Sequence, residues 1–345
     1  MRKLIHRYIP VHFHDPFGLA IRLIRSKDSA AWFAMATSAL GILCTPLDCL
    51  LQIAEKRLYQ KASAPRQPLI FVVGAPRTGT TLVSQVLINH LPVCFINNLT
   101  AVFPRSPITA NLLFGKFLPR REITYKSFYG KSTYFSGPND ALHIWDRWLG
   151  KDRTRIPGCF TAAQQEEMQK FFGAYEQAFK KPVLNKNNNL NMCADLIADV
   201  FERAHFICMT RDPLYLAQSL LIARIQIHGD PTISYGIDRD DKAYKNDTDF
   251  VRDVCEQVIF HENRIHSLQE KIGKDKFWIV EYERFCENPQ ELVDRVSREV
   301  LGEDINVKGK EASIEPFNVS STVRIDAELF EKLERTVNSL RQGSI

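Results

Sequence analysis

The chain of 345 residues is 45% hydrophobic and 25% charged, which excludes a mainly disordered or collagen-like protein. Its formal net charge of +5 predicts no nucleic-acid partner, whose recognition would require a clustered basic stripe, and suits a protein that binds a small, highly charged anion. The eight cysteines include no Cys-x-x-Cys pair, so we expect free thiols in a reducing compartment and no zinc site.

These features predict a cytoplasmic protein. Three Asn-x-Ser/Thr sequons leave the lumen of the secretory pathway as a less favoured location.

Residues 1–60 are predicted to form a basic and apolar N-terminal helical segment. An uncharged stretch, Ser29 to Leu47, is followed by Asp48 and a second apolar run, and basic residues flank both sides. The stretch is long enough to cross a membrane, but Pro46 and Asp48 argue against crossing. A helix pair in the membrane interface, or one packed on the protein, fits at least as well. The sequence leaves these alternatives open and favours peripheral membrane contact through residues 29–54, at the inner membrane face.

A short polar linker then leads into a domain expected over residues 65–345. Its first run, residues 68–73, is continuously apolar and rich in β-branched side chains, which is typical of a buried parallel strand. A glycine-containing turn follows, and then apolar residues recur at helical spacing from Leu82 to Leu87. The order of strand, glycine turn and helix is how an α/β nucleotide-binding sheet begins.

The same pattern returns twice. Residues 204–209 predict a second strand, after which Asp212 is placed to cap a helix and Pro213 to occupy its first turn. Residues 277–282 predict a third strand, followed by an amphipathic helix after Pro289. These units predict an α/β fold of the P-loop NTPase type, with a doubly wound parallel sheet flanked by helices.

The first turn, GAPRTGTT from Gly74, carries the clearest chemical signal. Its two glycines are five residues apart, and this arrangement lets backbone N–H groups surround a phosphate at the N-terminus of a helix. A nucleotide-triphosphate loop has lysine after the second glycine, whereas this chain has Thr80 there and carries a cation, Arg77, inside the loop. Without that lysine, γ-phosphoryl transfer loses its main charge contact. The loop therefore predicts phosphate binding and disfavours a kinase.

The segment FVVGAPRTGTTL resembles the 5′-phosphosulfate loop of sulfotransferases that use 3′-phosphoadenosine 5′-phosphosulfate (PAPS). The second strand region, FICMTRDPLYLAQS, resembles their 3′-phosphate element, and WIVEYERFCENPQEL is similar to a later strand of the same family. The resemblance covers roughly residues 68–302. It implies sulfuryl transfer from PAPS, which is released as 3′-phosphoadenosine 5′-phosphate (PAP), and requires no metal.

The resemblance also implies roles for individual residues. Arg77 matches the catalytic basic position and is expected at the bridging oxygen and the transferred sulfuryl group. Arg211 ends a strand and Ser219 lies on the next helix, so the two are expected to converge on one phosphate. Lys186 and Arg324 are weaker candidates for nucleotide contacts. The implied nucleotide-binding set is Arg77, Thr78, Gly79, Thr80, Thr81, Arg211 and Ser219.

Tyr282 and Glu283, at the end of the third strand, are expected to be a packing residue and a solvated charge.

The catalytic base departs from the family pattern. Several members place a glutamate about twenty residues beyond the loop, where this chain has Asn97 and Asn98. An amide cannot accept a proton as a carboxylate does. The next candidates are Asp140 and His143, which would share a face if both lay on a helix. Either could be the base, or the carboxylate could orient the imidazole; an N-cap aspartate with a half-buried histidine is the structural alternative.

The acceptor is the least defined part. Aromatic side chains are frequent in residues 122–148, where they could stack on a sugar or a lipid headgroup or pack in the core. The predicted acceptor is a hydroxyl or amine group of a small molecule, a glycan or a lipid. Two alternatives stay open: a P-loop nucleotide kinase or other phosphotransferase, and a catalytically silent nucleotide-binding membrane scaffold.

Overall fold

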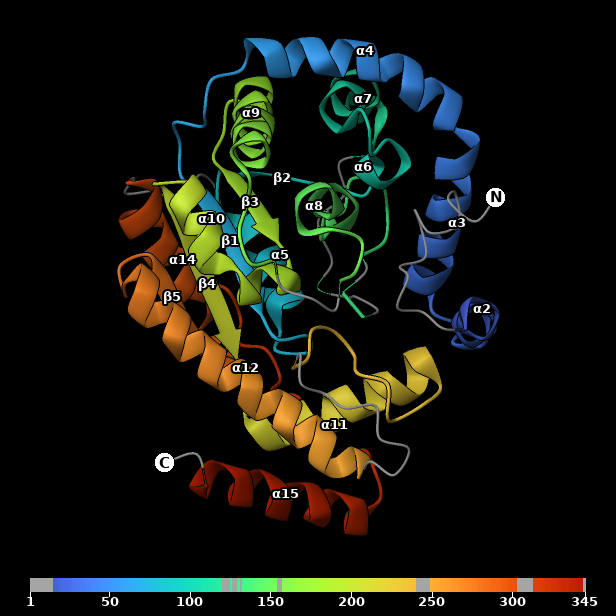
Figure 1. The fold of residues 1–345 in the computed structure, drawn as a ribbon, viewed down its shortest axis with the longest axis vertical. Helices are drawn as coiled ribbons and strands as arrows, with labels where there is room; N and C mark the ends of the chain where they lie inside the picture. Colours follow the sequence, from blue (N-terminus) through green and yellow to red (C-terminus); the bar gives the residue numbers. More distant parts are fainter. Residues whose placement is uncertain are drawn as a thin grey trace.

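The computed structural model describes residues 15–119, 125, 129–130, 132–153, 157–239, 249–302 and 313–343. Its centre is a five-stranded parallel sheet in the order β2-β3-β1-β4-β5. The strands are β1 (Leu69–Gly74), β2 (Cys94–Phe95), β3 (Val183–Lys186), β4 (Ala204–Thr210) and β5 (Phe277–Glu281). The predicted α/β fold, a parallel sheet flanked by helices, is confirmed (Figure 1).

Helices fill the connections between these strands. The α-helices before the third strand are α2 (Pro16–Arg25), α3 (Ser29–Leu43), α4 (Thr45–Lys61), α5 (Thr80–His90), α6 (Leu99–Val102), α7 (Pro107–Phe114), α8 (Leu142–Leu149) and α9 (Ala162–Phe179). Those after it are α10 (Ala194–Val200), α11 (Pro213–Ala223), α12 (Phe250–Ile272), α13 (Tyr282–Glu287), α14 (Pro289–Arg295) and α15 (Ala327–Gln342). Shorter or irregular turns of helix are η1 (Gly115–Phe117), η2 (Asn188–Met192), η3 (Arg224–His228) and η4 (Val296–Leu301).

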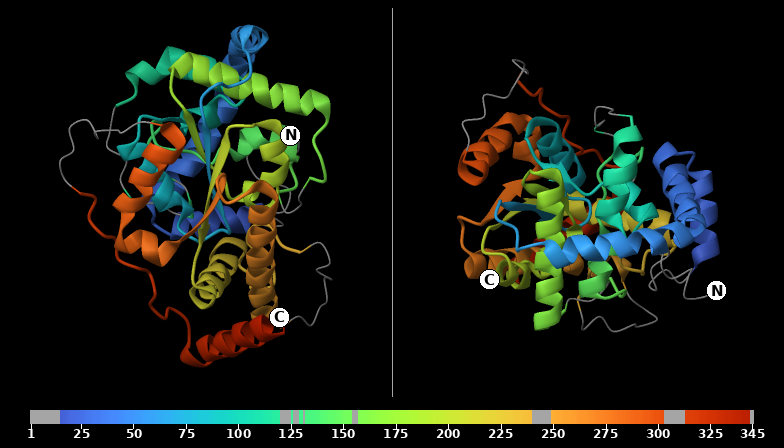
Figure 2. Two further views of the ribbon diagram at one scale, coloured as in Figure 1. Left: turned by 90° about the vertical axis from the view of Figure 1, so that its left-hand side faces the viewer. Right: turned by 90° about the horizontal axis from the view of Figure 1, so that it is seen from above.

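The apolar run of β1 supplies both faces of the sheet, because successive side chains of a strand point to opposite sides. Leu69, Phe71 and Val73 belong to one buried cluster, shared with α8, α9, α10 and α12. Ile70 and Val72 belong to a second, shared with α5, α13 and α14. Figure 2 shows helices on both faces of the sheet. A strand buried on both sides is usually apolar along nearly its whole length, which is why β1 could be recognised in the sequence.

The predicted helix starts after β4 and β5 are confirmed. The Asp212 carboxylate accepts hydrogen bonds from the backbone N–H groups of Leu214 (2.9 Å) and Tyr215 (3.2 Å), and Pro213 begins α11. Asn288 caps α14 in the same way. Since all five strands are parallel, their carboxyl ends and the loops that follow them gather at one edge of the sheet, where ligands of such folds bind.

Helix α4 is docked on the α/β domain by two buried acidic side chains. It crosses α7 and α9 (Figure 1). Asp48 and Glu55 are both fully buried. Asp48 accepts a hydrogen bond from the Ser106 hydroxyl (2.8 Å), and Glu55 accepts from the backbone N–H groups of Ile108 (3.1 Å) and Thr109 (2.7 Å). Glu55 thus satisfies two N–H groups in the first turn of α7, and both carboxylates lie at the N-terminus of this helix, where they complement its dipole.

The apolar N-terminal stretch therefore has specific partners within the protein. In the described part of the chain, no single helix is long and apolar enough to cross a membrane; α3 and α4 pass that test only together, as a pair bent by 74°. The first 14 residues of the predicted N-terminal segment lie outside the described residues.

The stability of the fold is expected to depend on pH through His261 on α12. His261 is 2% exposed, and its Nε2 lies 3.0 Å from the Ile237 carbonyl oxygen, to which Nε2–H donates. Burial lowers the pKa of His261 to about 4. In the unfolded chain this group titrates near its ordinary value of about 6.5. The unfolded state thus binds the proton more readily than the folded state. The contribution of neutral His261 to the stability of the fold is therefore full above about pH 6.5 and is lost as the pH falls towards about 4.

Because of the titration of His261, we expect the free energy of unfolding to be about 2 kcal/mol lower at pH 5 than at pH 7. Urea unfolding at both values tests this, with His261→Gln as the reference, since its amide keeps a donor for Ile237 and does not titrate. An equal drop in the variant and the parent would contradict the assignment.

Candidate active site

A cavity of about 710 Å³ lies at the carboxyl edge of the sheet. Its lining comes from the loop after β1 and from the segments that follow β3, β4 and β5. Residues of α2 and α3 also line it, together with residues between positions 98 and 153 and between 227 and 236, and in Figure 1 these two helices lie across from the sheet. The sheet thus supplies one side of a single cavity and the N-terminal helices supply the other.

The loop between β1 and α5 depends on its two glycines. Gly74 and Gly79 have φ values of +141° and +87°, which L side chains rarely adopt. A Cβ atom on Gly79 would lie 2.4 Å from the Tyr282 ring, and one on Gly74 would lie 2.5 Å from the Met209 carbonyl oxygen. Gly79 leads directly into α5, whose first N–H groups have no partner within the helix. Gly79, Thr80 and Thr81 all line the cavity.

Arg77 contacts two other residues that are predicted to bind the nucleotide. Its Nε donates to the Ser219 hydroxyl (3.1 Å), and its carbonyl oxygen accepts from Arg211 Nη1 (3.0 Å). Its guanidinium carbon lies 4.7 Å from the centre of the Tyr129 ring, a cation–π contact. Arg77 and Arg211 line the cavity, while Ser219, 2% exposed, lies behind Arg77. The structure therefore brings Arg77, Arg211 and Ser219 together.

Thr78 and Thr80 stabilise the loop from inside. Thr78 is buried, and its hydroxyl donates to the Ala75 carbonyl oxygen (2.7 Å) within the turn. The Thr80 hydroxyl donates to Asn188 Oδ1 (2.9 Å). Asn188 begins η2 directly after β3 and lines the cavity, a role that its sequence position did not reveal.

Tyr282 does more than pack. It begins α13 directly after β5, and its ring lies under the Arg211 guanidinium, 5.2 Å from ring centre to guanidinium carbon. It also lines the cavity. Glu283 is not merely a solvated charge either, because it accepts a hydrogen bond from the backbone N–H of Asp212 (3.2 Å). The available signal was the position of both residues at the carboxyl end of a strand next to β4.

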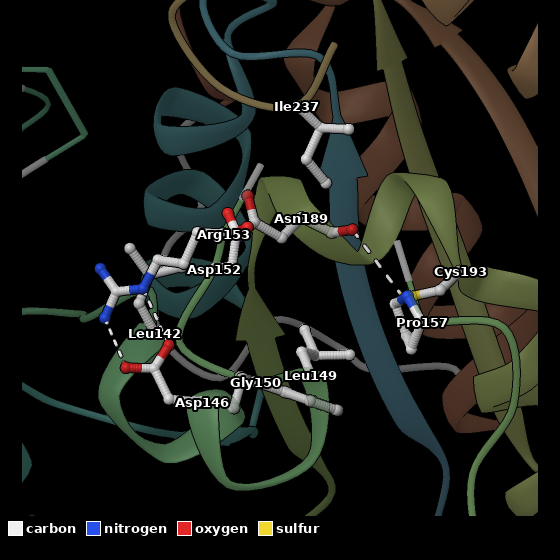
Figure 3. Close-up of a pocket in the computed structure, with 11 residues that line it drawn as sticks. Leu142, Asp146, Leu149, Gly150, Asp152, Arg153, Pro157, Asn189, Cys193 and Ile237 are labelled. Atoms are coloured by element: carbon white, nitrogen blue, oxygen red, sulfur yellow. Dashed lines mark hydrogen bonds and ion pairs between the residues drawn. The ribbon is translucent and has the colours of Figure 1, made fainter. Parts of the chain in front are cut away.

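The polar part of the cavity is strongly cationic. Burial, with smaller contributions from the neighbouring Arg77 and Arg324 cations, lowers the pKa of Arg211. Arg324 also lines the cavity, and its backbone N–H donates to Gln218 Oε1 (2.7 Å). Arg153 also lines the cavity and is held by two 2.8 Å hydrogen bonds to Asp146 of α8 (Figure 3). Among the described lining residues, five are cationic and Asp140 alone is acidic. This charge balance suits a ligand with several anionic groups.

Asp140 and Lys186 form an ion pair at the loop. Lys186 ends β3, and its Nζ lies 2.7 Å from Asp140 Oδ2. A Cβ atom on Gly130 would lie within 3.6 Å of Lys186 Nζ, Asp140 Oδ2 and Thr81 Oγ1, so the three polar groups surround one point. The candidate base is thus adjacent to the predicted phosphate loop.

The expected helical pairing of Asp140 with His143 is wrong. Helix α8 begins at Leu142, and Ala141 before it is left-handed with φ +56°, so Asp140 lies outside the helix. No side chain caps this helix, so Asp140 is not its N-cap either. Asp140 lines the cavity, whereas His143 is not one of the described residues that do. Of the two candidates, the described lining of the cavity therefore includes Asp140 alone.

Asn98 holds the loop that carries Asp140. Its Nδ2 donates to the carbonyl oxygens of Ser132 (3.1 Å) and Tyr134 (2.8 Å), and its Oδ1 accepts from Asn139 Nδ2 (2.7 Å). Asn97 instead donates to Asn111 Oδ1 (2.6 Å). The position where the resemblance expects a glutamate thus supports the loop on which a different carboxylate reaches the cavity.

The aromatic run divides between core and cavity. Several of residues 122–148 lie outside the described residues. Of the others, Trp145 and Trp148 are buried in the core, and Tyr125 and Tyr129 line the cavity. Burial raises the pKa of Tyr129, so its ring stays neutral beside Arg77. In the described part of the chain there is no group of three or more potential metal ligands.

The sequence model of the sulfotransferase family matches residues 68–302. Among solved structures, the chain is similar to sulfotransferase STF9 from Mycobacterium avium (TM-score 0.52, 16% identity, 90% of this chain and 76% of that one). It is also similar to sulfotransferase STF1 from Mycobacterium tuberculosis H37Rv (TM-score 0.52, 11% identity, 93% and 86%). No curated protein matches the chain by sequence.

Proposed function

The chain belongs to the sulfotransferase family, and we propose that it transfers a sulfuryl group from PAPS to a hydroxyl or amine group of an acceptor. The observation that carries this proposal is the contact of Arg77 with both Arg211 and Ser219, inside a loop that has Thr80 where a kinase needs lysine. Cations that converge beside a glycine loop fit a nucleotide with charge at both its 5′ and 3′ ends.

The residues of the site fit PAPS as donor. The first N–H groups of α5, with the hydroxyl of Thr81, would hold the 5′-phosphate, while the Thr80 hydroxyl holds Asn188 beside it. Arg211, supported from below by the Tyr282 ring, would bind the 3′-phosphate together with Ser219, and Arg324 would cover the nucleotide. When bound, PAPS supplies a phosphosulfate anhydride whose sulfuryl group can pass to an acceptor oxygen.

Two side chains would act on the reacting atoms. Arg77 is placed to stabilise the negative charge that develops on the leaving phosphate oxygen. Asp140 takes the proton from the acceptor hydroxyl, and its ion pair with Lys186 fixes its carboxylate at the loop. We assign the base to Asp140 rather than His143, because Asp140 lines the cavity.

Calorimetric titration with PAP, beside ATP with magnesium, tests the proposed donor. A 3′-phosphate held by charged donors gains hydrogen bonds that ATP cannot make, each of about 1.5–3 kcal/mol. We therefore expect PAP to bind about a hundredfold more tightly than ATP. The reverse preference would indicate a phosphotransferase. Binding of neither would favour the catalytically silent scaffold.

We further propose peripheral membrane contact through residues 29–54. On α4, the face turned away from Asp48 and Glu55 exposes Leu47, Leu50 and Ile53, by 40%, 65% and 59%. Lys56 and Arg57, also exposed, follow them. An apolar surface next to basic side chains suits the interface of an anionic membrane.

Sedimentation with phosphatidylglycerol vesicles tests this contact. Replacing Leu50 and Ile53 together by serine is expected to weaken vesicle binding by about tenfold or more, because each buried apolar side chain contributes about 1.5–3 kcal/mol. Val323→Ser, at a valine before α15 that is 52% exposed, is the control and should have no effect. Equal binding by all three proteins would exclude the proposed face.

A further inference from the structure

We infer that the acceptor is an amphiphile, an alcohol or amine whose hydrocarbon chain lies against the inner sides of α2 and α3. This inference rests on the proposed function, which places the reacting group of the acceptor near Asp140. The surface in question, called here the apolar wall, consists of Leu19, Leu23, Ala31, Phe33, Ala34 and Met35.

The apolar wall and the phosphate loop belong to one cavity. The residues of the wall line the same 710 Å³ space as Arg77, Thr81 and Asp140. Asn98 and Ala101 line the space as well. A molecule with its hydroxyl at Asp140 can therefore extend along the wall without leaving the cavity.

The two sides of the cavity differ in chemistry, because the side with Arg77 and Asp140 is charged and the wall is apolar. The residues of α2 and α3 that line the cavity include no charged side chain, and their only polar groups are the hydroxyls of Thr37 and Ser38. Both hydroxyls already donate hydrogen bonds within the helix, Thr37 to the carbonyl oxygen of Phe33 (2.8 Å) and Ser38 to that of Ala34 (2.9 Å). A sugar would leave its own hydroxyl groups without partners on such a wall, whereas a hydrocarbon chain needs none.

Contacts with the rest of the protein fix the wall in place. Arg22 of α2 donates from Nε to the Ile227 carbonyl oxygen (3.1 Å) of η3, and Ile227 itself lines the cavity. The Phe33 ring packs edge-on against Phe135, with ring centres 5.2 Å apart, on the loop that leads to Asp140. The wall is therefore tied to the elements that carry the reacting groups.

Binding of a series of linear primary alcohols, hexanol to decanol, tests the inference by calorimetry in the presence of PAP. Burial of each added methylene is expected to lower Kd by about threefold to fourfold. Leu23→Asn should raise the Kd for decanol by about tenfold, since a polar amide replaces apolar contact. Ile24→Asn is the matched control, because the adjacent isoleucine points outward and is 45% exposed.

A second pair of variants does not depend on a polar substitution. Ala34→Trp fills the space at the wall and should make octanol and decanol bind equally, while Ala36→Trp, at an exposed alanine of the same helix, should keep the dependence on chain length. The affinity for PAP reports on folding and should change by less than about twofold in all four variants.

An affinity that does not depend on chain length, or equal effects of the inward and outward substitutions, would overturn the inference. Loss of PAP binding in the parent protein would overturn the proposed function instead, and the chain-length dependence would still decide whether the wall binds hydrocarbon.

Discussion

Replacement of Arg77 by alanine is expected to lower kcat for sulfuryl transfer by about a thousandfold or more. Arg77 is the cation inside the loop between β1 and α5, and the proposed function puts it where charge develops on the leaving oxygen. Removal of one preorganised donor at such a position typically costs a factor of about 10² to 10³, and removal of a charged arginine costs about 10³ to 10⁵. Single-turnover kinetics with PAPS would measure the effect on the chemical step.

Its controls separate catalysis from folding. The Arg77 backbone is left-handed with φ +77°, a strain that arginine and alanine share, so the substitution should not alter the loop. Loss of the Arg77 hydrogen bond to Ser219 should cost only about 1 kcal/mol of stability. Arg25→Ala, at an exposed arginine of α2, should leave kcat unchanged. A kcat for Arg77→Ala close to that of the parent would contradict the proposed role of Arg77 in stabilising the leaving group.

The strand-to-helix units were predictable because their signals are local. The runs of β1, β4 and β5 are apolar. Gly79 starts the helix after β1 and Asp212 the helix after β4, whereas after β5 the short α13 comes before Asn288, which starts α14. The strands β2 and β3 were missed, since they have only two and four residues. In β3, buried Asn185 accepts from the Trp145 indole N–H (2.8 Å) and buried Lys186 pairs with Asp140. Partners about forty residues away make these polar residues compatible with a core strand, and no local pattern shows them.

The residues of the site also differ in how far the sequence could predict them. Arg77, Gly79, Thr80 and Thr81 follow one another in the sequence, so a motif identifies them. Tyr282 could not be assigned, because its contacts with Gly79 and Arg211 depend on the order of strands in the sheet. The pairing of Asp140 with His143 was predicted from helix geometry and was wrong, because Ala141 between them is left-handed. An alanine gives no sequence signal for that conformation, whereas a glycine would.

The N-terminal stretch shows why hydropathy alone left alternatives open. An apolar helix pair has the same composition whether it packs on a protein or enters a membrane interface. The buried carboxylates of Asp48 and Glu55 distinguish α4 from an isolated apolar helix, because their partners lie 58 and 54 residues away, at Ser106 and Thr109. Those contacts fix one face of α4, and its opposite face remains exposed.

Replacement of Asp140 by asparagine is expected to lower kcat with an aliphatic alcohol by about 10² to 10⁴, the usual contribution of a general base. Asparagine keeps the shape of the side chain and an oxygen for Lys186, but it cannot take a proton. The same variant should lose less than about tenfold with 4-nitrophenol, because this acceptor ionises near neutral pH and needs little help from a base. Steady-state kinetics with the two acceptors would measure the difference.

The two acceptors separate a base from a residue that only holds Lys186 in place. A positioning role would lower kcat equally for the alcohol and for the phenol, and Lys186→Met would then reproduce the loss on both. A base affects only the acceptor whose proton is held tightly, so the ratio of the two losses is the decisive quantity. His143→Asn serves as the control for the other candidate and should change neither rate, since the cavity lining includes Asp140 and not His143 among the described residues. If His143→Asn instead lowered the rate with the alcohol alone, the proton would pass through the imidazole, and Asp140 would be left as the partner of Lys186.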